Sequence, residues 1–431
     1  MSEFREEVPL KKKAGRQKQA GVRWMAYKFR LYPTHKQRGT LEWTLRRCRE
    51  LYNAALQERR EAYQLCGISI SYQMQADQLP AIKRLREEYQ DIHSQVQQDV
   101  LRRLDKAMAA FFRRVATGQK PGYPRYKSSD RYDSLTYAQT GFELIGKRLH
   151  LSKIGHIKIK VHRALTGKVK TCTIKREGEQ WYAVFTCESV CDPTLTFHPS
   201  QEAVGIDLGV KCFAVLSTGE AIENPRFYRS AEEQITEAHR KVARRKLHSH
   251  RRARAKRELS RTYRTVRNRR RDFLHKQART LTRRYRVLVF EDLKIPNMTA
   301  RPRPKHDEET QTYLPNGAAA KGGLNKSIQD AGWGQFVQLC TRKAEEAGGS
   351  VVRVAPKDTT QQCSGCHRIV PKDLSVRWHS CPHCGIELDR DHNAAKNILS
   401  RYHEYTGAGR VPQGPLTPRG GASGSCRSPQ L

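Results

Sequence analysis

Four cysteines in two close pairs place the tightest limit on how this chain can fold. Cys363-x2-Cys366 is followed, after a gap of 14 residues, by Cys381-x2-Cys384. Four thiolates at this spacing match a tetrahedral structural zinc site made from two knuckles, whereas one isolated Cys-x-x-Cys could serve redox chemistry. Three nearby histidines could also act as ligands, namely His367, His379 and His383. A full set of cysteines leaves them no vacancy, and a zinc ion with four protein ligands organises structure without performing chemistry.

A strong excess of positive charge points to a polyanionic partner. The 431 residues include 81 lysines and arginines against 43 aspartates and glutamates, a formal net charge of +38. So many like charges repel one another unless phosphates neutralise them, which makes nucleic acid the expected partner. No window reaches the roughly 18 apolar residues of a membrane span, and the polar start MSEFREEVPLKKKAGRQK lacks the apolar core of a secretion signal. We therefore expect an intracellular protein whose 12 cysteines form no disulfide framework.

The amino-terminal half predicts strands beside a bundle of helices. The segment VRWMAYKFRLYP, residues 22–33, alternates as a strand and stops at Pro33. Between residues 36 and 117, apolar side chains recur three or four positions apart, as in a helix. GQKPGYPRYKSSDRYDS then breaks the helix while placing tyrosines among basic residues, and residues 135–191 read as short strands separated by turns. A small β-barrel beside a helical bundle is the expected result.

A second change of composition comes at about residue 200. AVGIDLGVKCFAVLSTGE predicts a strand, a turn and a second strand, and RVLVFEDLKIPNM gives a buried strand that ends at Glu291. GWGQFVQLCTRKAEEAGG predicts a helix, and SVVRVAP predicts another strand. The polar, Gly- and Pro-rich stretch 299–327 between them reads as a mobile lid or a disordered loop.

Residues 240–284 contain 20 lysines and arginines and only two acids, Glu258 and Asp272. Six apolar residues form a stripe at helical spacing, namely Leu259, Tyr263, Val266, Phe273, Leu274 and Leu281. Two long basic helices packed by that stripe are expected. A solvated face is the alternative, but a face this one-sided gains little from salt bridges within the chain, so a track for a phosphate backbone fits better.

Three separated carboxylates suggest a second kind of metal site. Asp207 lies inside an apolar strand, Glu291 ends a later strand, and Asp389 or Asp391 starts a helix. Each has a structural reading by itself: a turn acceptor, a surface acid and an N-cap. Together they match the oxygen ligands that Mg²⁺ prefers, and two Mg²⁺ ions can neutralise the attacking and leaving oxygens in phosphodiester hydrolysis.

The choice between the two aspartates rests on where the helix of HNAAKNILSRY begins. Asp391 lies three, four and seven residues before Ala394, Ala395 and Ile398, which form the apolar face of that helix. Asp391 therefore points with that face toward the sheet. Asp389 lies before the helix and is better placed for capping or for a contact behind the metal ligands.

These segments carry a family resemblance. GIDLGVKCFAVLS, VLVFEDLKIPNM, SIQDAGWGQF, the four-cysteine ribbon and DRDHNAAKNI closely resemble the TnpB family of transposon-encoded RNA-guided DNA endonucleases, relatives of type V CRISPR effectors. The likeness extends to FRLYPTHKQ, CRELYNAAL and PGYPRYKSSDRYDS, and so runs from about residue 22 to 400. One departure is His367 after the first knuckle, where the family usually has glycine.

The resemblance implies a multidomain α/β fold. An amino-terminal wedge-shaped β-barrel would hold an inserted helical recognition domain, followed by a RuvC-like nuclease domain of the RNase H fold that contains the zinc ribbon. The expected bounds are a disordered basic tail at 1–20, the wedge barrel at 21–35 and 120–195, the recognition domain at 36–119, the nuclease domain at 200–362 and 385–404, the ribbon at 363–384 and a disordered tail at 405–431.

The resemblance also implies the activity. A single RuvC site with Asp207, Glu291 and Asp391 as catalytic acids would hold two Mg²⁺, with structural Zn²⁺ on Cys363, Cys366, Cys381 and Cys384. The partners would be a guide RNA from the transposon end and a double-stranded DNA target with a short adjacent motif, in the cytoplasm and associated with the nucleoid of a prokaryote. Alternatives are a non-cleaving DNA-binding accessory or regulatory protein of a transposon, a miniature type V CRISPR effector, and a DDE-type transposase.

Several residues are candidates for contacts with nucleic acid. They are Tyr72, Gln98, Arg125, Tyr137, Arg244, Arg251 and Arg270. The tyrosines offer stacking surfaces and the arginines offer phosphate contacts. The sequence does not identify the adjacent motif, the guide RNA or protein partners.

Overall fold

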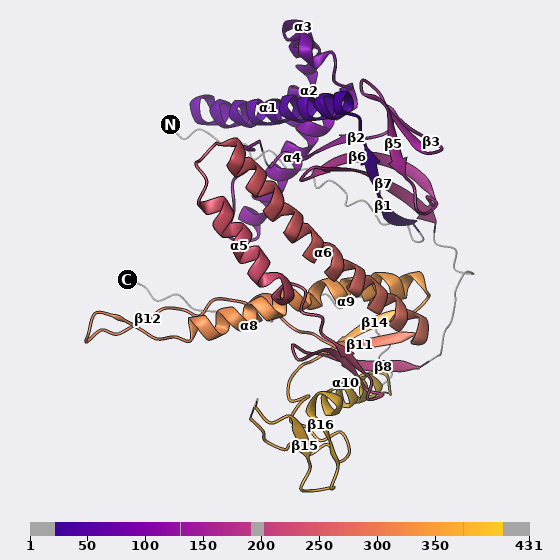
Figure 1. Cartoon of the computed structure of the whole chain (residues 1–431), viewed down its shortest axis with the longest axis vertical. Helices are drawn as coiled ribbons and strands as arrows, with labels where there is room; N and C mark the ends of the chain where they lie inside the picture. The colour runs from indigo at the N-terminus through magenta and orange to yellow at the C-terminus, as the bar shows by residue number, and fades with distance from the viewer. Residues whose placement is uncertain (1–21, 130, 191–201, 374, 408–431) are drawn as a thin grey trace, which may run out of the picture. The chain divides into compact units, whose positions relative to one another are not determined.

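The computed structural model describes residues 22–129, 131–190, 202–373 and 375–407 of the chain. It divides into two compact units, Met1–Asp192 and Pro193–Leu431 (Figure 1). Residues 1–21 and 408–431 lie outside the described part, so the predicted tails stay predictions there, although the last helix runs on to Gly407. None of the helices described is both long and apolar enough to cross a membrane.

A seven-stranded antiparallel sheet forms one half of the first unit. Its strands are β1 (Val22–Tyr32), β2 (Ser134–Tyr137), β3 (Phe142–Ile145), β4 (Arg148–Leu151), β5 (Gly155–Lys160), β6 (Lys168–Glu177) and β7 (Gln180–Val190), in the order β2-β6-β7-β1-β5-β4-β3. The predicted strand at 22–33 is confirmed, and Tyr27, Phe29 and Leu31 point into the core with the expected period of two. The edge strands β2 and β3 do not pair in the described residues, so the predicted barrel is confirmed in part, as an open half-barrel.

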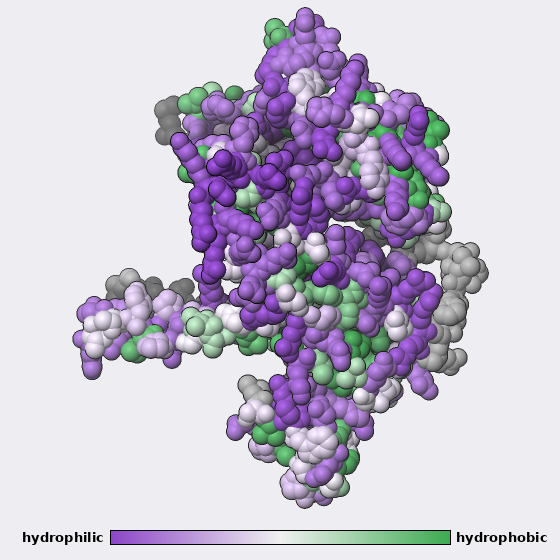
Figure 2. All heavy atoms as spheres, viewed as in Figure 1, coloured by the Kyte–Doolittle hydropathy of each residue, from purple (hydrophilic) through white to green (hydrophobic). Residues whose placement is uncertain are grey.

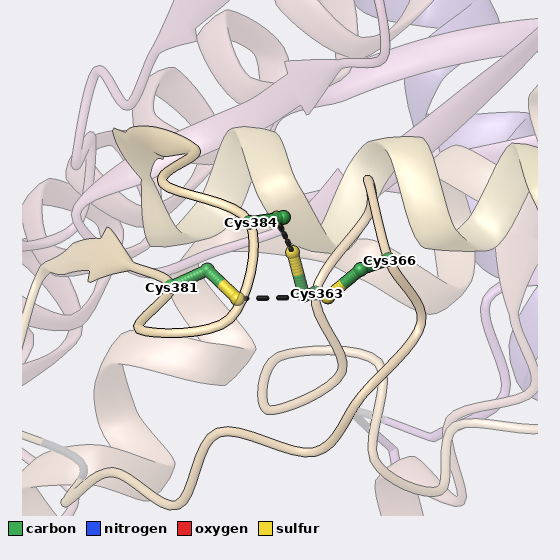
Figure 3. A group of neighbouring side chains, drawn as sticks. All are labelled: Cys363, Cys366, Cys381 and Cys384. Atoms are coloured by element: carbon green, nitrogen blue, oxygen red, sulfur yellow. Dashed lines mark hydrogen bonds between the residues drawn. The ribbon is translucent and has the colours of Figure 1, made fainter.

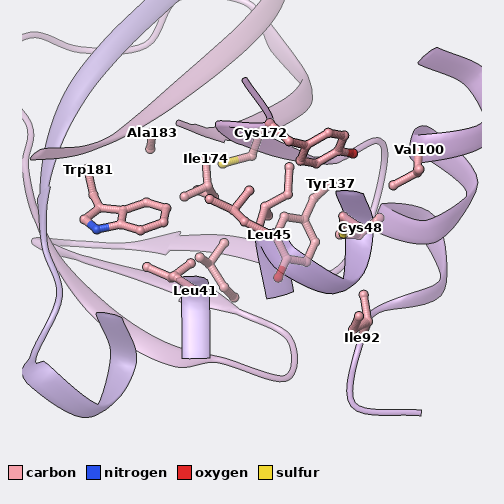
Figure 4. Close-up of a cluster of buried hydrophobic side chains, with 14 of the residues drawn as sticks. Leu41, Leu45, Cys48, Ile92, Val100, Tyr137, Cys172, Ile174, Trp181 and Ala183 are labelled. Atoms are coloured by element: carbon pink, nitrogen blue, oxygen red, sulfur yellow. The ribbon is translucent and has the colours of Figure 1, made fainter. Parts of the chain in front are cut away.

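Helices cover this sheet and share its core. They are α1 (His35–Cys66), α2 (Tyr72–Asp77), α3 (Leu79–Leu85), the short η1 (Glu87–Tyr89) and α4 (Ser94–Ala116). Thr34 and Gln37 form a capping box at the start of α1, and Gly67 ends it in the left-handed conformation. In Figure 4, Leu41, Leu45 and Cys48 of α1 lie among side chains of the sheet. The helical periodicity predicted for 36–117 is therefore confirmed, with its apolar face against the strands.

A mixed five-stranded sheet forms the centre of the second unit. Its strands are β8 (Ala203–Leu208), β9 (Cys212–Leu216), β10 (Ala221–Glu223), β11 (Val287–Glu291) and β14 (Ser350–Val354), in the order β10-β9-β8-β11-β14. The first three strands are antiparallel to one another, and β11 runs parallel to both β8 and β14. The predicted strands around Asp207, before Glu291 and at SVVRVAP are all confirmed.

The helices of this unit are η2 (Arg229–Ala231), α5 (Glu232–Ala243), α6 (His250–Arg284), α7 (Ile295–Met298), α8 (Ala318–Ala331), α9 (Trp333–Glu346) and α10 (Arg390–Gly407). The prediction of two long basic helices within residues 240–284 is wrong, because one helix of 35 residues, α6, covers most of this range and α5 ends at Ala243. Val266, Leu274 and Leu281 of the predicted stripe are buried, whereas Tyr263 is 39% exposed. The stripe therefore packs most tightly toward the end of α6.

The prediction of a disordered loop at 299–327 is wrong, whereas the alternative of a mobile lid stays a prediction. The strands β12 (Lys305–His306) and β13 (Tyr313–Leu314) form a small hairpin, and α8 begins at Ala318. The run Ala318–Lys321 favours a helix despite the two glycines that follow it. Buried Ile328 and Ala331 then anchor the end of α8 in the core.

The ribbon segment contains one short hairpin, β15 (Trp378–Ser380) and β16 (Glu387–Asp389). Strand β16 passes directly into α10, because Asp389 is its last residue and Arg390 is the first residue of the helix. Only Gly385 and Ile386 separate the second cysteine pair from β16, and no loop separates β16 from α10.

Candidate metal centres and nucleic-acid surface

Two of the three predicted acids lie side by side on neighbouring strands. β8 and β11 run parallel with Ile206 opposite Phe290, and Asp207 and Glu291 are the next residue of each strand. Neighbouring strands lie about 4.8 Å apart, and side chains at matching positions of a parallel pair point to the same face. The register therefore brings the two carboxylates together at the carboxyl ends of two parallel strands.

The third acid reaches the same place through α10. A side-chain Cβ at Gly205 would lie 2.1 Å from the carbonyl oxygen of Ala395, so the helix backbone rests directly on β8 at this glycine. Asp391, Ala395 and Leu399 follow one face of α10, and Gly205 and Asp207 follow one face of β8. Asp391 lies one helical turn before Ala395, and Asp207 lies two residues after Gly205. Both acids are therefore close to the point where α10 rests on β8.

The electrostatics of the acids reflect this grouping. Burial and the neighbouring carboxylates of Glu291 and Asp391 raise the pKa of Asp207 to about 8. Burial also raises the pKa of Glu291, against the effect of the Thr359 hydroxyl that donates to its carboxylate. Half-buried carboxylates that repel one another suit a divalent cation, which would remove that repulsion.

Two arginines lie against Asp391. Arg390 Nη2 lies 3.3 Å from one carboxylate oxygen and Arg377 Nη1, from the ribbon, lies 3.7 Å from the other. Asp389 is differently engaged, because its carboxylate accepts a hydrogen bond from the backbone nitrogen of Asp391 at 2.8 Å. The predicted capping contact of Asp389 is thus present, and its carboxylate serves the start of α10.

The four cysteine sulfurs form a compact group (Figure 3). All four atoms lie within 4.8 Å of one another, with 3.5 Å between Cys363 and Cys384 and 3.6 Å between Cys366 and Cys381. Zn–S bonds of about 2.3 Å in a tetrahedron place sulfurs a little under 4 Å apart, so the donor set fits zinc. In the described part of the chain no other group of His, Cys, Asp or Glu is as tight, and the three carboxylates are spread more widely.

The two knuckles have the same backbone turn. His367 N donates to Cys363 O at 2.9 Å, and Gly385 N donates to Cys381 O at 3.0 Å. Both residues after a knuckle are left-handed, with φ of 60° for His367 and 71° for Gly385. His367 therefore occupies a position that favours glycine, while the turn itself is preserved.

Sequence reasoning missed the asparagines that tie α10 to the ribbon. Asn393 donates to Gln362 O at 2.7 Å and accepts from Ser364 N at 2.9 Å, and Asn397 donates to both Thr359 O and Gln362 O. Both side chains are buried. The sequence pattern that could have revealed them is a pair of asparagines four positions apart on an otherwise apolar helix face. Buried amides need hydrogen-bond partners, so such a pair indicates polar contacts with a neighbouring segment.

The predicted nucleic-acid contacts differ in accessibility. Arg125, Arg244 and Arg251 are exposed, and Tyr72 and Gln98 are half-buried. Figure 2 shows hydrophilic side chains over α5 and α6, and Arg251 belongs to α6 while Arg244 directly follows α5.

Two of the predicted contacts need correction. Tyr137 is only 2% exposed, and its hydroxyl donates to Ser152 O inside the core, so it offers no stacking surface. Arg270 lies 2.6 Å from the buried Asp330 carboxylate, which also accepts from the backbone nitrogen of Tyr228. The guanidinium of Arg270 neutralises a buried acid, which is a structural role.

Comparisons with known proteins agree along the chain. Residues 186–301 match the family described as "Probable transposase", residues 333–398 match "Cas12f1-like, TNB domain", and residues 25–67 match "Helix-turn-helix domain". The last segment consists here of β1 and the single continuous helix α1.

Two relatives align over most of their length. "Putative RNA-guided DNA endonuclease InsQ" of Escherichia coli (strain K12) is 30% identical over 395 residues, 91% of this chain and 95% of the relative. A "Putative RNA-guided DNA endonuclease" of Streptomyces pristinaespiralis is 31% identical over 386 residues, 87% of this chain and 88% of the relative. Among solved structures, a complex of Cas12f1 with sgRNA and target DNA aligns at 14% identity with a TM-score of 0.32, over 88% of this chain and 99% of that one.

Proposed function

Since this chain belongs to the TnpB family of transposon-encoded RNA-guided DNA endonucleases, we propose that it cuts double-stranded DNA at a site chosen by a bound guide RNA. Cleavage would be phosphodiester hydrolysis at one RuvC-like site, next to a short motif in the target. The guide would come from the transposon end.

The observation that carries this proposal is the convergence of Asp207, Glu291 and Asp391. Two of these acids lie at the carboxyl ends of neighbouring parallel strands, Asp207 one residue before the end of β8 and Glu291 at the end of β11, and the third starts a helix that rests on Gly205 of the same sheet. The strand order, three antiparallel strands followed by two parallel ones, supports an RNase H-like arrangement for the second unit. The half-barrel and its helices support the wedge and recognition roles for the first unit.

The three acids would hold two Mg²⁺, which when bound neutralise charge on the attacking and leaving oxygens of the scissile phosphate. Thr359 fixes one oxygen of Glu291 by donating to it. Arg377, half exposed, and Arg390 balance the charge of Asp391. The ribbon would hold zinc on its four cysteines and position α10.

Guide dependence is tested with the purified chain and the RNA that copurifies with it. RNase treatment should abolish sequence-specific cutting, and adding back the sequenced RNA should restore it. Cutting that continues undiminished after complete RNA removal would refute guidance by RNA.

The nuclease site is tested with Glu291→Gln, which keeps the size of the side chain and removes its charge. We expect target binding to persist while cleavage is lost. Glu308→Gln is a suitable control, because Glu308 is exposed in the segment joining β12 to β13. If wild-type protein loaded with RNA binds its target but never cuts with Mg²⁺, the accessory-protein alternative is correct.

A further inference from the structure

A buried threonine engages one oxygen of the Glu291 carboxylate. Thr359 is 2% exposed, and its hydroxyl donates to Oε1 of Glu291. The same hydroxyl lies 3.3 Å from the carbonyl oxygen of Pro356. A hydroxyl has one proton to donate, and an ionised carboxylate is a stronger acceptor than a neutral carbonyl. The hydrogen bond to Glu291 is therefore the one that forms when this acid is charged.

The backbone that carries Thr359 is held by the turn before the first cysteine and by α10. Asp358 is left-handed, with φ of 59°, and its carbonyl oxygen accepts from Gln361 N at 3.2 Å and Gln362 N at 2.8 Å. Thr359 O accepts from Asn397 Nδ2 of α10 at 2.8 Å. A left-handed non-glycine residue persists only where its surroundings determine the backbone strongly. The hydroxyl is therefore fixed in place and does not follow movements of Glu291.

The second oxygen of Glu291 is left open. Among the described residues, Oε2 has no hydrogen-bond or ion-pair partner. The side chain is partly exposed at the end of β11, next to the strand that carries Asp207. The protein thus leaves Glu291 one unengaged oxygen with which to bind a cation.

The number of oxygens that a carboxylate offers affects which divalent cation it prefers. Ca²⁺ accepts about six to eight oxygens in a flexible geometry, including both oxygens of one carboxylate, whereas Mg²⁺ demands a nearly ideal octahedron and keeps several waters. The two oxygens of one carboxylate lie too close together to fill neighbouring corners of that octahedron. A carboxylate confined to one oxygen therefore suits Mg²⁺, and a carboxylate with two free oxygens also suits Ca²⁺.

From these contacts we propose that Thr359 is a positioning residue that confines Glu291 to binding metal through Oε2 and makes the site of acids favour Mg²⁺ over Ca²⁺. The inference rests on the proposed function, because that function makes Glu291 a metal ligand. Hydrogen bonds to metal-binding carboxylates commonly set both their orientation and the metal affinity. Without the hydroxyl, Glu291 is free to turn both oxygens toward one ion, which benefits Ca²⁺.

Four variants separate this role from a general effect on stability. Thr359→Val removes the hydroxyl and keeps the shape of the side chain, and Thr359→Ser keeps a hydroxyl. Thr282→Val is the matched control, because Thr282 is buried in α6 and its hydroxyl donates to Ala278 O at 2.8 Å, away from the acids. Glu291→Gln removes the charged ligand itself and shows how the chain responds to cations without the site.

Metal affinity is measured without cleavage, from the rise in melting temperature of RNA-free protein as Mg²⁺ or Ca²⁺ is added. An ion that binds only the folded chain stabilises it increasingly as its concentration exceeds the dissociation constant. The rise seen with Glu291→Gln is subtracted. In a second assay, RNA-loaded protein cuts its target at a fixed Mg²⁺ concentration, and the Ca²⁺ concentration that halves the single-turnover rate is recorded.

We expect Thr359→Val to lose about 10–100-fold in Mg²⁺ affinity, the usual effect of removing a hydrogen bond to a metal ligand. Its Ca²⁺ affinity should fall by a smaller factor or rise, so Ca²⁺ should inhibit its cleavage at a lower concentration than in the wild type. Thr359→Ser should keep the wild-type preference. Thr282→Val should also keep it, even if its melting temperature without metal is lower.

The proposal is overturned if Thr359→Val changes Mg²⁺ and Ca²⁺ affinity by the same factor or changes neither. A loss of preference in Thr359→Ser equal to that in Thr359→Val would also overturn it. Equal responses of wild type and Glu291→Gln to Mg²⁺ would count against the proposed nuclease site itself. A Mg²⁺ response specific to wild type, together with an unchanged preference in Thr359→Val, would count against the role of Thr359 alone.

Discussion

Gly205→Ala tests whether the contact between β8 and α10 positions the three acids. The new Cβ would lie 2.1 Å from Ala395 O and 2.8 Å from Leu399 N, whereas ordinary contacts of a Cβ begin at 3.4 Å. Both neighbours are backbone atoms, so no side chain can rotate away. Strand and helix must therefore move apart by roughly 1 Å, and overpacking of this kind typically costs about 1–3 kcal/mol of folding free energy.

The effect on cleavage should exceed the effect on stability. Asp207 and Asp391 lie on the two elements that separate, and a displacement of about 1 Å at a catalytic group can lower a rate by roughly 100-fold. Single-turnover cleavage at saturating Mg²⁺, measured well below the melting temperature of the variant, isolates this effect. Target binding, measured in parallel, should stay near the wild-type level.

Gly322→Ala is the matched control. Gly322 lies within α8, and an added Cβ there would meet no atom within 4 Å. This substitution should stabilise the protein by about 0.5–1 kcal/mol and leave cleavage unchanged. If Gly205→Ala cuts as fast as wild type at equal occupancy of the target, the contact does not position the acids and our account of the site fails.

Four further results are expected. Asp391→Ala should lower the single-turnover cleavage rate by several orders of magnitude. Asp389→Ala should mainly lose about 0.5–2 kcal/mol of folding stability, because a capping contact disappears. If Asp389→Ala lost cleavage and Asp391→Ala kept it, the wrong acid would have been chosen. Cys381→Ser should lower the zinc content, which is about one ion per chain in the wild type and is measured by mass spectrometry. It should also reduce cleavage, because zinc binding contributes to local folding. A protein that is free of zinc and fully active would contradict this. Asp207→Asn should stabilise the metal-free protein increasingly from pH 5 to pH 8. Because the pKa of Asp207 is raised to about 8 in the folded protein, native Asp207 keeps a proton that the unfolded chain releases near pH 4, so the stability of the wild type falls across this window. A difference in melting temperature between the variant and the wild type that stays constant with pH would refute this. His367→Gly should slow zinc release to a chelator, because a left-handed non-glycine residue costs about 1 kcal/mol; unchanged release would show that the turn is unstrained.

The strands of the second unit were predictable because buried strands appear in the sequence as short runs of apolar residues. β8 and β11 are apolar runs with one acid each, at the residue before the last in β8 and at the last residue in β11, and both lie between other strands of the sheet. An acid in such a run, as at Asp207, conflicts with burial unless it has a function. The four cysteines were predictable for a related reason, since their spacing fits one geometry of metal binding.

Other features depend on contacts that a single sequence does not reveal. Tyr137 and Arg270 have the composition of surface ligands, yet the first is enclosed by the sheet core and the second neutralises buried Asp330. The barrel remains open because β2 and β3 find no pairing with each other in the described residues, which depends on long-range register. The helix α8 was missed because Gly and Asn in its sequence obscure the anchoring of Ile328 in the core.

The closed zinc site and the open site of acids are linked through α10. Four cysteines leave zinc no chemistry of its own, but the ribbon leads into α10 through β16 and is tied to it again where Asn393 bonds to Gln362 and Ser364. These attachments fix the first turn of the helix, where Asp391 lies. A well-ordered ribbon therefore holds the start of α10 in place, and with it the carboxylate of Asp391. On the proposed function, a zinc ion that performs no chemistry would still serve the nuclease, because it would hold the acid Asp391 in position.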